Sequence, residues 1–303
     1  MAIADPEEAT EAVNDQPLSS YKKLSRLRRT GSGAAYDIPN DPEDITGGYL
    51  IEWDMASRSE SYASWYQTTH MRFLGLKSPK YLSRAQYLYI TDLLQGFEDA
   101  LYSKTGYNDE GKYYTDYIDL GSFVRKYMLE EVSKNFDGSR SSQYLYKPSD
   151  SVSTKLFAGP AWDYDSAWGA FARNEQKTDT LYPSGFLTSK SRGDGTWWGV
   201  LYAHTDFFEE VCRVYEAQYR PALSILLGEE EDPSGVLRSV DAYIEPIHAA
   251  IDMNYTRWTF GNRGGAARTG TTFEANIKYL KDFISGRRDF LDKEWLKSGT
   301  SAE

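Results

Sequence analysis

Short apolar runs and longer helical patterns alternate in the first half of the chain. The segment "GGYLIEWD" (47–54) is aromatic and branched between Gly and Asp, which is typical of a buried strand. Residues 83–103 and 119–136 repeat apolar positions at helical spacing, and the first stretch follows a Ser that suits an N-cap. The short segments 143–147 and 155–165 then predict a β-hairpin.

The second half predicts a Gly- and Trp-rich loop at 169–199, followed by helices at 200–227, 234–255 and 272–296. Together with the first half, this order predicts an α+β fold that is mainly helical and has a few short strands. Residues 1–46 are polar and carry turn residues, so we expect a loop-like segment there. We expect the folded lobe to span 47–296 and a flexible tail to follow at 297–303.

Composition narrows the function classes. The chain has 303 residues with 24 Tyr and 8 Trp, and we expect most of these rings to pack in a core. Its net charge of −11 argues against a nucleic-acid-binding face. No stretch reaches the ~18 apolar residues of a membrane span, and the acidic start does not resemble a signal peptide. One cysteine, Cys212, excludes an intrachain disulfide and is expected to be buried in a helix.

Two aspartates occupy positions that suit phosphoryl transfer. Asp137 follows the end of a predicted long helix, and Asp163 follows the predicted hairpin, 26 residues further on. Phosphoryl transfer needs one carboxylate that orients the attacking hydroxyl and a second that holds the metal on the nucleotide phosphates. In kinases these two groups lie after a long helix and after a short hairpin. The same acids could instead stabilise their own loops, as Asp does in many turns.

Four segments in this order resemble the CotH kinase family of spore-coat H proteins, which are atypical secretory-type protein kinases. They are "GGYLIEWD", "EEVSKNFDGSRSSQYLYK", "KLFAGPAWDYDSAWG" and "RRDFLDKEW", and the likeness runs from about residue 40 to 296. The resemblance implies a kinase-like helical large lobe and transfer of the ATP γ-phosphate to protein Ser or Thr hydroxyls. It implies Mg²⁺ or Mn²⁺ as cofactor, a protein substrate or coat partner, and a bacterial, exported, cell-surface or spore-coat location.

The resemblance also assigns site residues. Asp137 corresponds to the catalytic aspartate and Asp163 to the metal-binding aspartate, while Asn135 shapes the catalytic loop and belongs to the cofactor site. Asp165 would face the same side as Asp163 in an extended chain, and it is either a second metal ligand or a cap on the following turn. Ser142 stands where the kinase pattern has a metal-binding Asn, and Gln143 follows it.

The N-terminal region departs from the kinase pattern. Kinases need a small-lobe lysine for the phosphates and a glutamate that positions it. Residues 1–46 contain Lys22 and Lys23 but no strand–Lys–helix–Glu pattern. We therefore expect either a fragment or a protein that has lost most of its small lobe.

Two alternatives stay open. A non-catalytic coat or surface scaffold would use the loop "GDGTWWGVLY" (193–202) as a contact surface, although its Trp residues suit a core equally well. A glycoside hydrolase would use Asp137 and Asp163 beside Trp162, Trp168, Trp197 and Trp198. The "GSG" at 31–33 lacks the flanking strand and helix of a phosphate loop, and the three histidines are too far apart in sequence to indicate a metal site.

Overall fold

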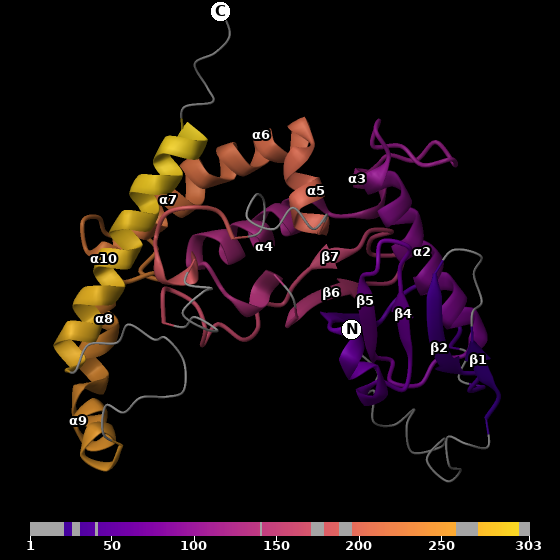
Figure 1. Ribbon diagram of the computed structural model, residues 1–303, viewed down its shortest axis with the longest axis horizontal. Helices are drawn as coiled ribbons and strands as arrows, with labels where there is room; N and C mark the ends of the chain where they lie inside the picture. The colour runs from indigo at the N-terminus through magenta and orange to yellow at the C-terminus, as the bar shows by residue number, and fades with distance from the viewer. Residues whose placement is uncertain are drawn as a thin grey trace, which may run out of the picture. The chain divides into compact units, whose positions relative to one another are not determined.

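A computed structural model describes residues 21–25, 31–39, 42–139, 141–170, 179–187, 196–258 and 272–296 (Figure 1). The chain divides into two compact units. Unit 1 comprises residues up to Phe123 together with Arg140–Trp162, and unit 2 comprises Val124–Ser139 and the chain from Asp163 onward. The polypeptide thus leaves unit 1, contributes a short segment to unit 2, and returns.

The described strands of unit 1 form one antiparallel sheet of seven strands in the order β1-β2-β4-β5-β3-β6-β7. Its strands are β1 (Lys23–Ser25), β2 (Ser32–Tyr36), β3 (Tyr49–Asp54), β4 (Trp65–Gln67), β5 (Phe73–Ser78), β6 (Gln143–Lys147) and β7 (Phe157–Ala158).

Strand β3 lies inside the sheet, where it pairs with β5 on one side and β6 on the other. Ile51 stands opposite Leu76 of β5 and Leu145 of β6, and all three side chains are buried. Such a strand has no edge to expose, which explains why its sequence is a nearly continuous apolar run. The strand predicted at 47–54 is confirmed.

Helix α2 (Arg84–Tyr102) packs on this sheet (Figure 1). Ser83 and Gln86 form a capping box at its start, as the sequence indicated. Tyr87 donates a hydrogen bond to the carbonyl of Trp65 (2.9 Å), and Tyr66 of β4 donates to Gln95 (2.7 Å). A short helix, α3 (Tyr114–Tyr117), follows in unit 1.

Unit 2 is helical and is organised around α4 (Leu120–Ser133), most of which belongs to it. Tyr127 of α4 packs against Trp198, Tyr202, Phe207 and Trp295 at ring-centroid distances of 5.6–6.4 Å. The other helices are α5 (Trp197–Ala203), α6 (Thr205–Val214), α7 (Arg220–Leu227), α8 (Val240–Ile244), α9 (His248–Arg257) and α10 (Phe273–Leu291). Much of the aromatic content therefore fills cores, as expected.

The α+β class is confirmed, but the sheet is larger than the sequence suggested. Strands β1 and β2 lie in the segment expected to be loop, and β4 and β5 were not predicted. These strands are three to six residues long and too short for a clear alternation. The "GSG" lies at the start of β2, where an added Cβ at Gly33 would stand 1.9 Å from the Tyr87 hydroxyl oxygen. Close packing, and not phosphate binding, explains that glycine.

The helices also differ in detail from the prediction. The predicted helix 200–227 is broken at His204 and contains a π-helical turn at Tyr215–Tyr219. The predicted helix 234–255 begins at Val240 and is divided by a 3-10 segment at Glu245–Ile247. Cys212 is only half-buried on α6, which corrects the expectation of a buried side chain. Among the described helices, none is long and apolar enough to cross a membrane.

Candidate active site

The first acidic loop follows the C-terminal end of α4. Lys134 adopts a left-handed conformation (φ 48°), which reverses the chain directly after Ser133. Asn135 and Phe136 are buried, and half-buried Asp137 begins a 3-10 turn that ends at Ser139. The prediction that Asp137 follows a long helix is therefore confirmed.

The second acidic loop, residues 163–168, runs beside the first within unit 2. The Trp168 amide donates to the Ser133 carbonyl (2.7 Å), and the Phe136 amide donates to the Ser166 carbonyl at 3.5 Å. The side-chain amide of Asn135 donates to the backbone carbonyl of Asp163 (3.2 Å). These bonds hold the loop of Asp137 against the loop of Asp163, the pairing that a two-carboxylate site requires.

The side chains of Asp163 and Asp165 are exposed. Asp163 has a left-handed backbone (φ 66°), so the chain is not extended there and the geometric argument that Asp165 faces the same side does not hold. The Asp165 carboxylate instead accepts a hydrogen bond from the Ser166 hydroxyl (3.2 Å). Its role as a metal ligand stays a prediction.

A buried ion pair contacts the second loop through Tyr164. Lys126 and Glu130, one turn apart on α4, are joined at 2.6 Å, and their side chains are 3% and 0% exposed. The Tyr164 hydroxyl donates to the same Glu130 oxygen (2.5 Å) and accepts from Lys126 (3.1 Å). Burial, reinforced by the Glu130 charge, raises the pKa of Tyr164, so its hydroxyl keeps its proton. Because Tyr164 follows Asp163, this triad fixes the chain next to the predicted metal ligand.

A second buried pair anchors the first loop. The guanidinium of Arg287, from α10, is fully buried and bonds the carboxylate (3.0 Å) and the carbonyl (2.6 Å) of Glu131. The Lys134 ammonium donates to the carbonyls of Tyr182 (3.0 Å) and Ser184 (2.7 Å). Burial lowers the pKa of Arg287 and the Glu131 charge opposes that change. The backbone next to Asp137 is therefore held in place by hydrogen bonds from buried charged side chains.

Neither buried pair was predicted from the sequence. The only sequence signal for the Lys126–Glu130–Tyr164 triad was the Lys and Glu four residues apart in "RKYMLEE", a spacing equally common on exposed helix faces. Of the predicted residues, Ser142 belongs to unit 1, is buried and has a left-handed backbone (φ 59°). Its assignment to the cofactor site stays a prediction.

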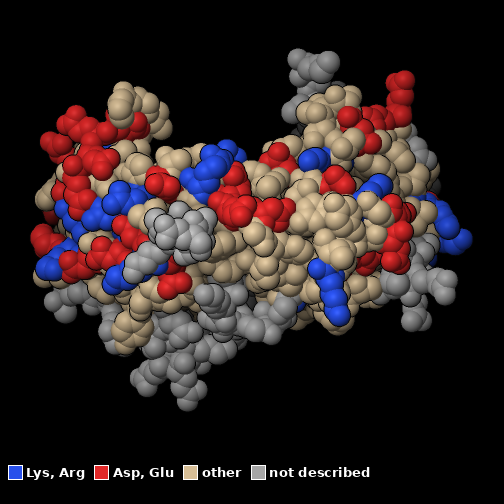
Figure 2. Space-filling model, turned by 90° about the horizontal axis from the view of Figure 1, so that it is seen from above, with Lys and Arg blue, Asp and Glu red and all other residues tan. Residues whose placement is uncertain are grey.

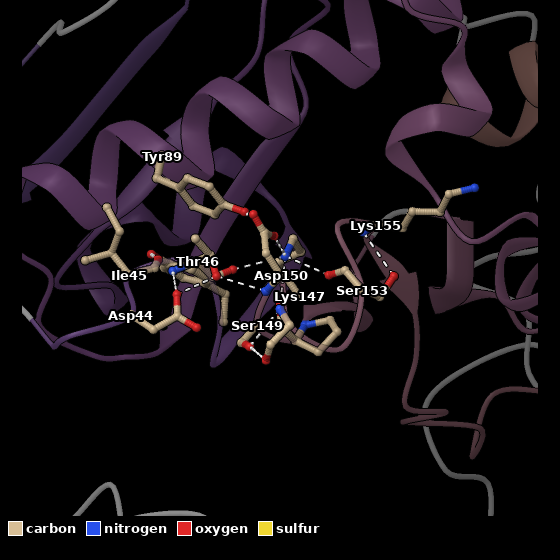
Figure 3. Close-up of polar contacts among 12 residues, drawn as sticks. Asp44, Ile45, Thr46, Tyr89, Lys147, Ser149, Asp150, Ser153 and Lys155 are labelled. Carbon is tan, nitrogen blue, oxygen red and sulfur yellow. Dashed lines mark hydrogen bonds and ion pairs between the residues drawn. The ribbon is translucent and has the colours of Figure 1, made fainter.

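Unit 1 contains a buried lysine that resembles a phosphate ligand only superficially. The ammonium of Lys147 donates to the carbonyls of Thr46, Pro148 and Ser153 and to the Asp150 carboxylate, at 2.6–3.1 Å (Figure 3). Its three N–H groups are thus fully used, and its side chain is 0% exposed. Lys147 ties the 44–46 segment to the turn after β6 and has no capacity left for a nucleotide. In the same unit, Lys77 of β5 pairs with Glu52 of β3 (3.1 Å), which joins two strands and not a strand and a helix.

Two of the four tryptophans considered for a sugar site are buried. Trp197 and Trp198 begin α5 and are 1% and 3% exposed, so they belong to the core. Trp162 is 60% exposed and Trp168 is half-buried. The glycoside hydrolase alternative therefore loses two of the rings on which it depended. The same two rings are unavailable as contacts for the scaffold alternative, and residues 193–195 of its proposed loop lie outside the described residues.

A family model described as "CotH kinase protein" matches residues 34–291. Because the match covers most of the chain, the protein belongs to the CotH kinase family. Membership indicates a kinase-like protein and links it to the spore coat. No curated protein matches the chain.

Proposed function

We propose that this protein is a metal-dependent protein kinase that transfers the ATP γ-phosphate to Ser or Thr hydroxyls of a protein substrate. The observation that supports it best is the Asn135–Asp163 contact, which keeps the loops of Asp137 and Asp163 side by side after a long helix. This is the arrangement that phosphoryl transfer needs, and family membership supports the same activity.

Each acid has a distinct role in this proposal. The carboxylate of Asp137 accepts the proton of the substrate hydroxyl as its oxygen bonds to the γ-phosphorus. The bond between that phosphorus and the oxygen bridging to the β-phosphate breaks, and ADP leaves with the electron pair. Asn135 is a positioning residue that holds the Asp163 loop, and the Lys126–Glu130–Tyr164 triad supports it from behind. Asp165 would complete the metal site within unit 2.

The donor set suits a hard divalent cation. Asp163 and Asp165 are exposed carboxylates, and the buried side-chain oxygen of Asn135 has no hydrogen-bond partner among the described residues. Mg²⁺ is commonly held by one or two carboxylates together with substrate phosphates. Among the described residues no cluster of three or more acid, His or Cys side chains could hold a metal by itself, which fits an ion that arrives with ATP. Mg²⁺ or Mn²⁺ would neutralise charge on the β- and γ-phosphates.

The substrate and location follow from the family by inference. A bacterial spore coat or cell surface is the proposed setting, with an exported protein or another coat protein as substrate. The alternative function is a kinase-like scaffold that binds coat proteins without catalysis.

Calorimetric titration of ATP with Mg²⁺ or Mn²⁺ tests the nucleotide site. We expect metal-dependent binding that Asp163→Ala abolishes and that Asp289→Asn, an exposed acid on α10 of the same unit, leaves unchanged. Transfer from γ-labelled ATP to a coat-protein extract, or to the chain itself, should be lost in Asp137→Asn while nucleotide binding persists. If the folded chain binds no nucleotide with either metal, the kinase proposal is wrong and the scaffold alternative gains.

A further inference from the structure

Unit 1 has an open cleft of about 710 Å³ that the proposed kinase site does not include. It lies between α2 and the turn that follows it, residues 103–117. Its lining includes the side chains of Asp92, Asp99, Tyr102, Tyr107, Lys112 and Tyr117.

The lining is strongly acidic. Four carboxylates, those of Asp92, Asp99, Asp109 and Glu110, face a single ammonium, that of Lys112. All four acids are exposed. Acidic side chains also occur at several other places on the face shown in Figure 2, so charge alone would not distinguish this cleft.

Tyrosine rings with fixed positions distinguish it. Tyr102 stacks on His70 with ring centroids 3.6 Å apart, and Tyr107 packs against Tyr113 at 4.8 Å while remaining 52% exposed. The Tyr117 hydroxyl accepts a hydrogen bond from Asn108 (2.7 Å). Rigid aromatic faces beside carboxylates form the environment that attracts ammonium and guanidinium groups.

Gly96 creates the space in which one of these rings lies. An added Cβ at Gly96 would stand 2.9 Å from the ring and hydroxyl atoms of Tyr117. The Asn108 side chain also donates to the Gly96 carbonyl (3.4 Å). These contacts hold residues 103–117 against α2, so the cleft keeps its shape without a ligand.

The protein already places one cation in this environment. The ammonium of Lys112 lies 5.6 Å from the centre of the Tyr117 ring and 3.4 Å from the Glu110 carboxylate. Its side chain is 56% exposed, so it can move aside. Lys112 thus shows, within the chain itself, how an incoming amine would be held, between a ring face and a carboxylate.

The spacing of the acids favours a polypeptide over a small amine. Asp92 and Asp99 are seven residues apart on α2, which places them on one face and about 10 Å apart along the axis. A peptide in the polyproline II conformation advances by about 3.1 Å per residue with three residues per turn, so basic side chains three residues apart would lie on one face and about 9 Å apart. Asp109 and Glu110 offer further carboxylates from the opposite wall.

We propose that this cleft binds a lysine- or arginine-containing segment of a partner polypeptide, with its cationic groups over the tyrosine rings and paired with the carboxylates. The proposal does not depend on phosphoryl transfer. If the protein is a kinase, such a segment would be a docking sequence that is separate from the phosphorylated hydroxyl.

The test uses fluorescence anisotropy of the full chain with a fluorescein-labelled peptide, GSKGSKGSKG, whose lysines are three residues apart. We expect saturable binding that weakens with added salt, and none to the matched GSEGSEGSEG peptide. Asp92→Asn/Asp99→Asn should weaken binding at least tenfold. The control Glu43→Gln/Glu60→Gln removes the same charge from exposed positions elsewhere in unit 1 and should change binding less than twofold.

The Lys112→Met variant tests the proposal in the other direction, because it should raise the affinity for the peptide and not lower it. The substitution releases Tyr117 and Glu110 for an incoming cation, so binding of the lysine peptide should tighten. The proposal fails if the peptide does not bind, if the control double variant weakens binding as much as the cleft variant, or if Lys112→Met weakens it. It also fails if spermine binds the cleft while the peptide does not, because the occupant would then be a small amine.

Discussion

Replacing Lys126 with Met should strongly destabilise unit 2. Methionine keeps the length of the side chain but removes its charge. The fully buried Glu130 carboxylate then loses its counter-ion and keeps the hydrogen bond from the Tyr164 hydroxyl. The other Glu130 oxygen, Oε2, already lacks a hydrogen-bond partner in the part of the chain that the structure describes. Removing one member of a buried ion pair typically costs about 3–5 kcal/mol, which is a large share of the ~5–15 kcal/mol that stabilises a domain.

Urea denaturation measures this loss. Five of the eight tryptophans belong to unit 2, so fluorescence reports mainly on its unfolding. With a slope of about 2 kcal/mol per molar urea, the midpoint should fall by roughly 2 M. Lys278→Met is the matched control, because Lys278 and Asp282 have the same spacing and the same 2.6 Å separation but are 75% and 62% exposed. Exposed pairs contribute below about 1 kcal/mol.

A third variant distinguishes the free-energy cost of burying an unpaired charge from the cost of lost side-chain packing. Lys126→Met/Glu130→Leu/Tyr164→Phe replaces the whole triad with apolar groups and should recover most of the lost stability, as happens when buried ion pairs are replaced as a set. Equal effects of Lys126→Met and Lys278→Met would refute the reasoning, because they would show that the Lys126–Glu130 pair is not buried in solution.

Three further predictions concern local contacts. Lys147→Met should destabilise unit 1 by about 3 kcal/mol in urea denaturation, since four oxygen acceptors lose a charged donor, whereas Lys155→Met should have little effect. Ser83→Ala should cost about 1 kcal/mol by the same measurement because it removes the capping box of α2, and a loss below 0.3 kcal/mol, roughly, would contradict that role. Backbone and side-chain donors from Leu237 and Ser234 lower the pKa of Asp232 to about 2, so its stabilising contribution is complete above the unfolded value near 4 and is lost as pH falls toward 2. An NMR titration of Asp232 with a midpoint near 4 would overturn this assignment.

The sequence predicted the elements that carry long, regular patterns. Helices α2 and α4 were found close to their expected bounds because their apolar residues repeat over several helical turns, and β3 because its apolar and aromatic run is bounded by Gly and Asp. Strands β1 and β4 were missed because each has three residues and is defined by its partners in the sheet. Pairing between short strands depends on tertiary context, which periodicity does not report.

The candidate site was likewise predicted only in part from the sequence. The positions of Asp137 and Asp163 followed from the spacing of a helix, a hairpin and two acids. The supporting contacts did not, because Tyr164 reaches Glu130 across 34 residues and Arg287 reaches Glu131 across 156. A Lys and a Glu four residues apart form this internal triad only because both side chains are buried. Their burial depends on the complete folded structure, which the local sequence does not report.

The discontinuous order of the two units has a consequence for synthesis of the protein. Strand β3 receives its partner β6 only after the chain has left unit 1 and returned, about ninety residues later. Until β6 emerges from the ribosome, one side of β3 is an unpaired apolar edge, which is the kind of surface that promotes aggregation. A single cut cannot release either unit whole, since truncation after residue 123 would remove β6 and β7, and truncation before residue 124 would leave those strands without the rest of their sheet. We therefore expect each unit to fold only when both units are present in one continuous chain.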